Sequence, residues 1–80
     1  MATGYVLINS EFGEENNIIS ILKRDKLVKE IMMTRGSYDI VTKIETGNFL
    51  KISEFINSHL CKLPQVSSTL TLIVNDANLS

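Results

Sequence analysis

Hydrophobic and polar residues alternate, or gather in short β-rich runs, in four stretches of this chain. These stretches predict strands at Tyr5–Asn9, Leu27–Thr34, Tyr38–Ile44 and Val66–Val74. Only Arg35-Gly36-Ser37 separates the second stretch from the third, and so short a link with a glycine predicts a hairpin of antiparallel strands. In that turn Gly36 can take the positive φ that residues with a side chain avoid.

Apolar residues at helical spacing predict a first helix between the first two strands. Glu14 and Glu15 suit its first turn and Lys23 and Arg24 its last, because these charges complement the helix dipole. Its apolar stripe consists of Ile18, Ile19, Ile21 and Leu22.

A second helix is predicted from Phe49 to about Leu63. The segment Thr46-Gly47-Asn48 breaks the preceding strand and supplies an N-cap, and Pro64 cannot continue the helix. The apolar stripe comprises Phe49, Ile52, Phe55, Ile56, Leu60 and Leu63, while Leu50 falls on the far side.

The order strand, helix, strand, strand, helix, strand predicts an α+β fold. Two interleaved split βαβ units form the ferredoxin-like sandwich, in which both helices cover one face of a four-stranded antiparallel sheet. The other face would then carry Tyr5 or Val6, Met32 or Met33, Ile40 or Val41, and Thr69 or Thr71. We expect so large an apolar face to pack against a second subunit.

The last predicted strand alternates hydroxyl and aliphatic side chains. A period of two places Ser67, Thr69 and Thr71 on one face and Ser68, Leu70 and Leu72 on the other. A small face that can form hydrogen bonds suits a subunit contact or a small polar ligand.

Composition narrows the class of protein. Eighty residues make one domain, and eight basic against nine acidic side chains argue against autonomous binding to nucleic acid. The single Cys61 suits a reducing compartment, and neither a signal peptide nor a membrane span is apparent, so we expect a cytoplasmic protein. One histidine and one cysteine cannot form a structural metal site, and no phosphate-binding loop or nucleophile motif occurs, so we expect no cofactor.

Two residues of the second helix have chemically reactive side chains. His59 falls within the apolar stripe, and we expect a half-buried histidine bonded to a backbone carbonyl rather than a catalytic base. Cys61 falls on the opposite side of the helix, where no charged neighbour would lower its pKa, and we expect an inert surface thiol.

Three stretches together resemble the C-terminal effector-binding and assembly domain, or RAM domain, of the Lrp/AsnC (feast/famine) transcriptional regulators. They are Tyr5–Asn9, Thr34–Val41 and Leu63–Val74, and they occur in the family's order and spacing over nearly the whole chain. Family members usually carry an N-terminal helix-turn-helix domain, whereas this chain begins almost directly at the first strand. It resembles a stand-alone effector domain spanning residues 1–80, with a polar tail at 75–80.

The resemblance implies a ligand and an assembly. Family domains dimerise through their open sheet faces into a dimeric α+β barrel, the dimers assemble into rings such as an octamer or decamer, and amino acids bind at contacts between dimers. By resemblance, the ligand-binding residues are Arg35, Gly36, Ser37, Tyr38, Asp39, Thr69 and Thr71. Gly36 lets backbone N–H groups approach a carboxylate, Asp39 can accept from an ammonium group, and the threonines add hydrogen bonds without charge.

The implied role is regulation of transcription or metabolism through partner proteins, including full-length Lrp/AsnC relatives, without direct binding to nucleic acid or membrane and without enzymatic activity. Two alternatives stay open: a small cofactor-free enzyme of the dimeric α+β barrel type, with His59 or Asp39 as the base, and an oligomeric scaffold that binds nothing. Gly36 and Asp39 can also serve only the turn, and Thr69 and Thr71 can be plain strand residues at a subunit contact.

Overall fold

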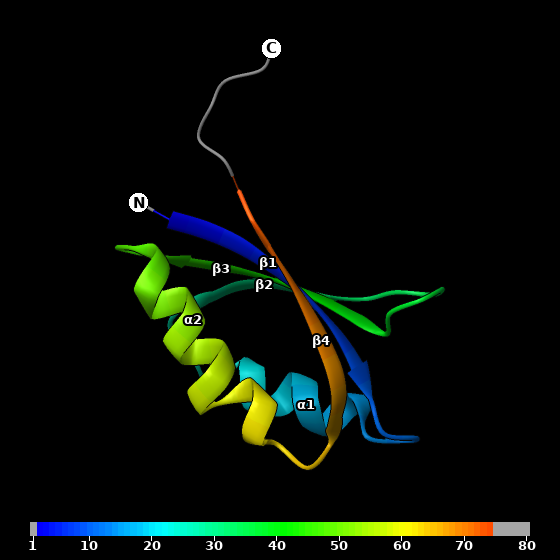
Figure 1. The fold of residues 1–80 in the computed structure, drawn as a ribbon. Helices are drawn as coiled ribbons and strands as arrows, with labels where there is room; N and C mark the ends of the chain where they lie inside the picture. The colour runs from blue at the N-terminus through cyan, green and yellow to red at the C-terminus, as the bar shows by residue number, and fades with distance from the viewer. Residues whose placement is uncertain (1, 75–80) are drawn as a thin grey trace.

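Two helices cover one face of a four-stranded antiparallel sheet in the computed structural model, which describes residues 2–74 (Figure 1). The elements are β1 (Ala2–Ser10), α1 (Glu15–Leu22), β2 (Val28–Met33), β3 (Ile40–Thr46), α2 (Phe49–Ser58), a 3-10 turn (Leu60–Lys62) and β4 (Val66–Ile73). The strands lie in the order β2-β3-β1-β4, and each neighbouring pair is antiparallel. The predicted ferredoxin-like βαββαβ sandwich is therefore confirmed.

The boundaries of some elements differ from the prediction. β1 begins at Ala2, because Ala2 pairs with Thr46 at the far end of β3. The hairpin link is longer than predicted and comprises residues 34–39, although the Thr34 N–H still donates to the Asp39 carbonyl at 2.8 Å. α2 ends at Ser58, and the 3-10 turn completes the segment that was predicted as helix. The predicted polar tail at 75–80 lies outside the described residues.

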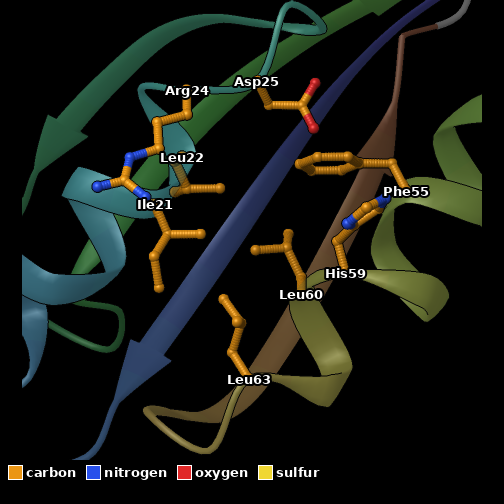
Figure 2. Close-up of a pocket in the computed structure, with 8 residues that line it drawn as sticks. All are labelled: Ile21, Leu22, Arg24, Asp25, Phe55, His59, Leu60 and Leu63. Carbon is orange, nitrogen blue, oxygen red and sulfur yellow. The ribbon is translucent and has the colours of Figure 1, made fainter.

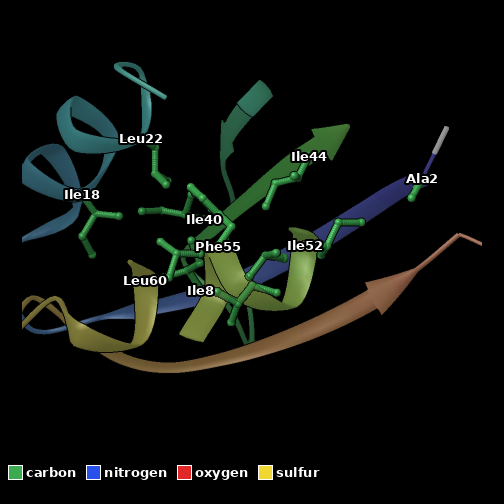
Figure 3. Packing of buried hydrophobic residues seen from close by; sticks show 11 residues of the cluster. Ala2, Ile8, Ile18, Leu22, Ile40, Ile44, Ile52, Phe55 and Leu60 are labelled. Carbon is green, nitrogen blue, oxygen red and sulfur yellow. The ribbon is translucent and has the colours of Figure 1, made fainter. Parts of the chain in front are cut away.

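The alternation of side chains along β1 and β3 separates the core from the opposite face. Val6 of β1 is completely buried, as are Ile8 of β1 and Ile40 and Ile44 of β3, which Figure 3 shows in the core. The helices complete this core with Ile18, Leu22, Ile52, Phe55, Ile56 and Leu60. Side chains from the sheet and from both helices therefore share one hydrophobic cluster.

Local sequence signals set the start of α2. The Asn48 side chain accepts a hydrogen bond from the Lys51 N–H at 3.1 Å, which confirms the predicted N-cap. Leu50 is exposed as expected, but Phe49 is also 55% exposed, so the buried stripe begins one turn later, at Ile52.

The register of β4 on β1 decides which of its faces meets the helices. Thr69 pairs with Ile8 and Thr71 with Val6, so both threonines lie on the helix-covered side. Leu70 and Leu72 pair with Leu7 and Tyr5 on the opposite side. The expectation that Thr69 or Thr71 lies on the open face is therefore wrong, because directly paired residues point to the same side of a sheet.

A buried hydroxyl stabilises the pairing of β2 with β3 where the register of β2 shifts between Val28 and Glu30. The Thr42 hydroxyl donates to the Glu30 carbonyl at 2.9 Å, and Thr42 is completely buried. This hydrogen bond supplies a partner for a backbone carbonyl at an irregular point of the ladder.

We predict that Thr42→Val lowers the free energy of unfolding by about 1–2 kcal/mol, because it keeps the shape of the side chain and leaves the Glu30 carbonyl without this donor. Urea denaturation at a fixed protein concentration measures the change. Thr46→Val is the control, since Thr46 is buried on the same face of β3 but lacks the Glu30 contact. Equal losses in the two variants would contradict a specific role for the Thr42 hydrogen bond.

Candidate functional site

The hairpin between β2 and β3 is closed by its own hydrogen bonds. The Thr34 hydroxyl donates to the Tyr38 carbonyl at 2.7 Å, in addition to the backbone bond between Thr34 and Asp39. Gly36 has φ of +120°, which confirms the predicted positive φ. A residue with a side chain would be strained there, so the loop depends on this glycine.

Asp39 connects the hairpin to the end of β1. Its Oδ2 atom accepts hydrogen bonds from the Ser10 N–H at 2.9 Å and from the Ser10 hydroxyl at 3.4 Å. The Asp39 N–H donates to the Ile8 carbonyl at 3.0 Å. Asp39 therefore holds a structural role in this chain, and that role uses only one of its two carboxylate oxygens.

The hydroxyl residues of β4 lie on the other side of β1 from the hairpin. Thr69 and Thr71 are half-buried, and the Thr69 Oγ1 atom lies 3.9 Å from the sulfur of Cys61, which is exposed. Ile8 pairs with Ile40 on one side and Thr69 on the other, so two strand spacings, or roughly 10 Å, separate the β3 and β4 backbones.

The seven residues predicted to bind a ligand thus form two groups within one chain. Arg35, Gly36 and Ser37 are exposed at the tip of the hairpin, and Tyr38 and Asp39 are half-buried at its base. Thr69 and Thr71 form the second group. The structure brings each group together but keeps the two groups apart on either side of β1.

The sheet face opposite the helices is predominantly apolar on β1 and β4. Leu70 and Leu72 retain 44% and 51% of their exposure there, beside Leu7 and Tyr5, and Met32 on β2 retains 46%. We call this surface the open face. It is the side of the sheet that neither helix covers in Figure 1.

A charged cluster interrupts the open face on β2 and β3. The Lys43 ammonium lies 3.6 Å from the Glu30 carboxylate and 3.7 Å from the Glu45 carboxylate. The pKa of Lys43 is raised above its ordinary value by its electrostatic interactions with the neighbouring Tyr5, Glu45 and Glu30 side chains. Charged side chains therefore lie on the part of the open face near β2, and aliphatic side chains lie on the part near β4.

A cavity of about 220 Å³ lies between the C-terminal ends of the two helices. Its lining residues are Ile21, Leu22, Arg24, Asp25, Phe55, His59, Leu60 and Leu63 (Figure 2). We call this space the interhelical cavity. The sequence did not predict it, because its walls come from two segments about thirty residues apart.

His59 differs from its predicted environment. The residue is exposed, and its ring lies against Phe55 with 5.5 Å between the ring centroids and a tilt of 32°. The prediction of a half-buried histidine is therefore wrong. His59 keeps its helical position, since its N–H donates to the Phe55 carbonyl at 2.9 Å, but it borders the interhelical cavity and is therefore not covered by packed side chains.

Within residues 2–74 no three or more histidine, cysteine, aspartate or glutamate residues gather where they could hold a metal ion. None of the helices in the described part of the chain is long and apolar enough to cross a membrane.

Comparison with known proteins identifies related chains. The family model of the Lrp/AsnC ligand-binding domain matches residues 3–77. The HTH-type transcriptional regulator FL11 of Pyrococcus abyssi is 31% identical over 70 residues, which cover 88% of this chain and 46% of that protein. The chain thus spans about half the length of the curated relatives it matches.

Solved structures share the fold. The crystal structure of FFRP-DM1 matches with a TM-score of 0.91 and 29% identity, over 94% of this chain and 100% of that one. The transcriptional regulator NMB0573 of Neisseria meningitidis, solved as a complex with L-Met, matches with a TM-score of 0.87 over 95% of this chain and 51% of that one. Its identity is only 10%, so this likeness shows the fold alone.

We predict that Asp39→Ala lowers the free energy of unfolding by about 1.5–3 kcal/mol, because the Ser10 N–H loses a charged acceptor. Asp39→Asn keeps an amide oxygen in this position and should lose less. Chemical denaturation of both variants measures the difference. If Asp39→Ala is as stable as the unmodified chain, the hydrogen bonds to Ser10 do not stabilise the fold.

Proposed function

Because this chain belongs to the Lrp/AsnC ligand-binding domain family, we propose that it is an effector-binding and oligomerisation module. It acts in the regulation of transcription or metabolism through partner proteins and not by binding DNA itself. The near-neutral balance of eight basic and nine acidic side chains supports this, since binding to nucleic acid depends on clustered positive charge. Its partners are further copies of the chain and full-length Lrp/AsnC relatives, in the cytoplasm.

The open face is the observation that supports oligomerisation. Leu70, Leu72 and Met32 remain about half exposed on one continuous side of the sheet. A domain of this size buries only about 60% of the surface of its unfolded chain, so a partner surface adds substantially to its stability. Two copies packed sheet to sheet cover this face, and the resulting dimers join into a ring such as an octamer or decamer.

The effector is proposed to be an amino acid held at the hairpin and the hydroxyl strand. Arg35, Gly36, Ser37, Tyr38 and Asp39 supply backbone N–H groups, a cation and a carboxylate, and Thr69 and Thr71 supply hydroxyl groups. Since β1 separates these two groups within one chain, a complete site needs a neighbouring subunit that presents one group opposite the other. Binding at such a site is then coupled to assembly.

Three features support an amino acid as the ligand class. The family is described as a ligand-binding domain, and a protein of the same fold has been solved with L-Met. The Asp39 Oδ2 atom bonds to Ser10, which leaves Oδ1 for an ammonium group. The exposed backbone around Gly36 can approach a carboxylate without a Cβ in the way.

An enzymatic role is less well supported by the candidate bases. His59 is exposed and lies against Phe55, whereas Asp39 bonds to the end of β1 and lines none of the cavities that contain His59. We therefore propose a regulatory module without catalytic activity. The open face equally supports a scaffold that assembles and binds no ligand. The two experiments below distinguish such a scaffold from an effector-binding module.

We predict that Leu72→Glu reduces the assembly to single chains, because a carboxylate buried against another sheet would be desolvated without a partner. Light scattering after size-exclusion chromatography measures the mass in solution. Leu50→Glu is the matched control, since Leu50 is 73% exposed on the outer side of α2. Dissociation by Leu50→Glu and not by Leu72→Glu would place the subunit contact on the helix side instead.

We predict that the unmodified chain binds at least one of the twenty amino acids with a Kd between about 1 µM and 1 mM, measured by titration calorimetry. Gly36→Ala should weaken this binding at least ten-fold, because the substitution strains the loop that approaches the ligand.

Gly13→Ala is the control for that experiment. Gly13 also has a positive φ, of +78°, and an added Cβ would meet nothing within 4 Å at either glycine. Both substitutions strain a backbone with positive φ, so a loss of binding by Gly36→Ala but not by Gly13→Ala identifies the hairpin. Flat titrations with all amino acids, beside an intact assembly, would instead favour the scaffold.

A further inference from the structure

We propose that the interhelical cavity is a second small-molecule site, complete within one chain, for an α-amino acid with an apolar side chain. Its volume of about 220 Å³ exceeds that of a cavity of about 150 Å³ that is known to hold benzene. An aliphatic or aromatic side chain of an amino acid therefore fits. The ligand class rests on the proposed function, and the site lies away from the hairpin.

The floor of the interhelical cavity is apolar and buried. Leu22, Phe55 and Leu60 retain at most 4% of their exposure, and Ile21 and Leu63 complete the walls. Figure 2 shows the side chains of α1 facing those of α2 across the space. An apolar group entering it leaves water without requiring the core to rearrange.

Asp25 supplies a fixed negative charge at the mouth of the cavity. Its Oδ1 atom accepts a hydrogen bond from the Leu27 N–H at 2.9 Å, which holds the side chain in place. Figure 2 shows its carboxylate directed toward the ring of Phe55. An ammonium group between this carboxylate and the aromatic ring would gain both a charge-assisted hydrogen bond and a cation–π contact.

Arg24 supplies the opposite charge on the α1 side of the cavity, where Figure 2 shows its guanidinium beside Ile21 and turned away from Phe55. Its guanidinium can bind a carboxylate with two parallel hydrogen bonds. Among residues 2–74 the ion pairs are those of Lys43, so Arg24 and Asp25 are not already paired with each other. Asp25, Arg24 and the apolar floor thus correspond to the ammonium group, the carboxylate and the side chain of an apolar amino acid, respectively.

A neighbouring cavity limits the direction in which a ligand can extend. Its volume is about 230 Å³, and it shares Asp25, Phe55 and His59 with the interhelical cavity. Lys51 and Glu54 make its lining charged, so it does not suit an apolar side chain. The apolar part of the ligand therefore points toward Leu60 and Leu63.

Titration of ¹⁵N- and methyl-labelled protein with L-leucine tests the proposal by NMR. We expect saturable shifts at Ile21, Leu60 and Leu63. Two analogues separate the charged contacts: 4-methylpentanoate lacks the ammonium group and 3-methylbutylamine lacks the carboxylate, and each should bind at least ten-fold more weakly than leucine.

Asp25→Asn should weaken leucine binding at least ten-fold while the fold is retained, because the amide oxygen can still accept from the Leu27 N–H. Arg24→Gln should have a similar effect. Lys23→Gln is the matched control, since Lys23 is also an exposed basic residue but does not line the interhelical cavity. Equal binding by the Asp25→Asn variant and the unmodified chain would overturn the proposal.

The location of the shifts distinguishes this proposal from the hairpin site. Saturable shifts confined to residues 35–39 and to Thr69 and Thr71 would overturn the interhelical site and leave the proposed function intact. Shifts at the interhelical cavity alone would support the second site and remove the hairpin as the leucine site. No shift with leucine, isoleucine, methionine or phenylalanine at millimolar concentration would overturn the interhelical site.

Discussion

The rest of this structure depends on the register with which β1 pairs on both of its edges. Ile8 is opposite Ile40 on one side and Thr69 on the other, so three strands alternate in step. Because the side-chain period of a strand is two, a slip by one residue would exchange the core with the open face along an entire strand. The aliphatic core beneath the helices and the apolar surface opposite it are therefore two results of one pairing pattern.

Features determined by neighbouring residues could be predicted from the sequence. The strand and helix order, the positive φ of Gly36 and the Asn48 cap all depend on residues close together in the chain, and the structure confirms each of them. The direction in which Thr69 faces was not predictable in this way. An alternation of Thr and Leu fits either orientation, and only pairing with a strand some sixty residues earlier decides between them.

The geometry of the candidate site also depends on residues that are far apart in the sequence. The hairpin tip was identified from its glycine, but the bonds from Ser10 to Asp39 join residues 29 positions apart, and no local pattern indicates them. His59 is exposed although its N–H donates to the Phe55 carbonyl as in a continuing helix, because the space beside it is an open cavity and not packed side chains. The interhelical cavity lies between segments that are remote in sequence, so its charged opening forms only when the helices pack together.

The bonds between Asp39 and Ser10 also make the hairpin and the end of β1 one mechanical unit. β1 occupies an interior position in the sheet and carries Tyr5 and Leu7 on the open face. The hairpin is therefore tied, through a single carboxylate, to the strand whose Tyr5 and Leu7 side chains lie on the open face. In a sensor built this way, a central strand and not a flexible linker would connect the ligand site to the contact with another subunit.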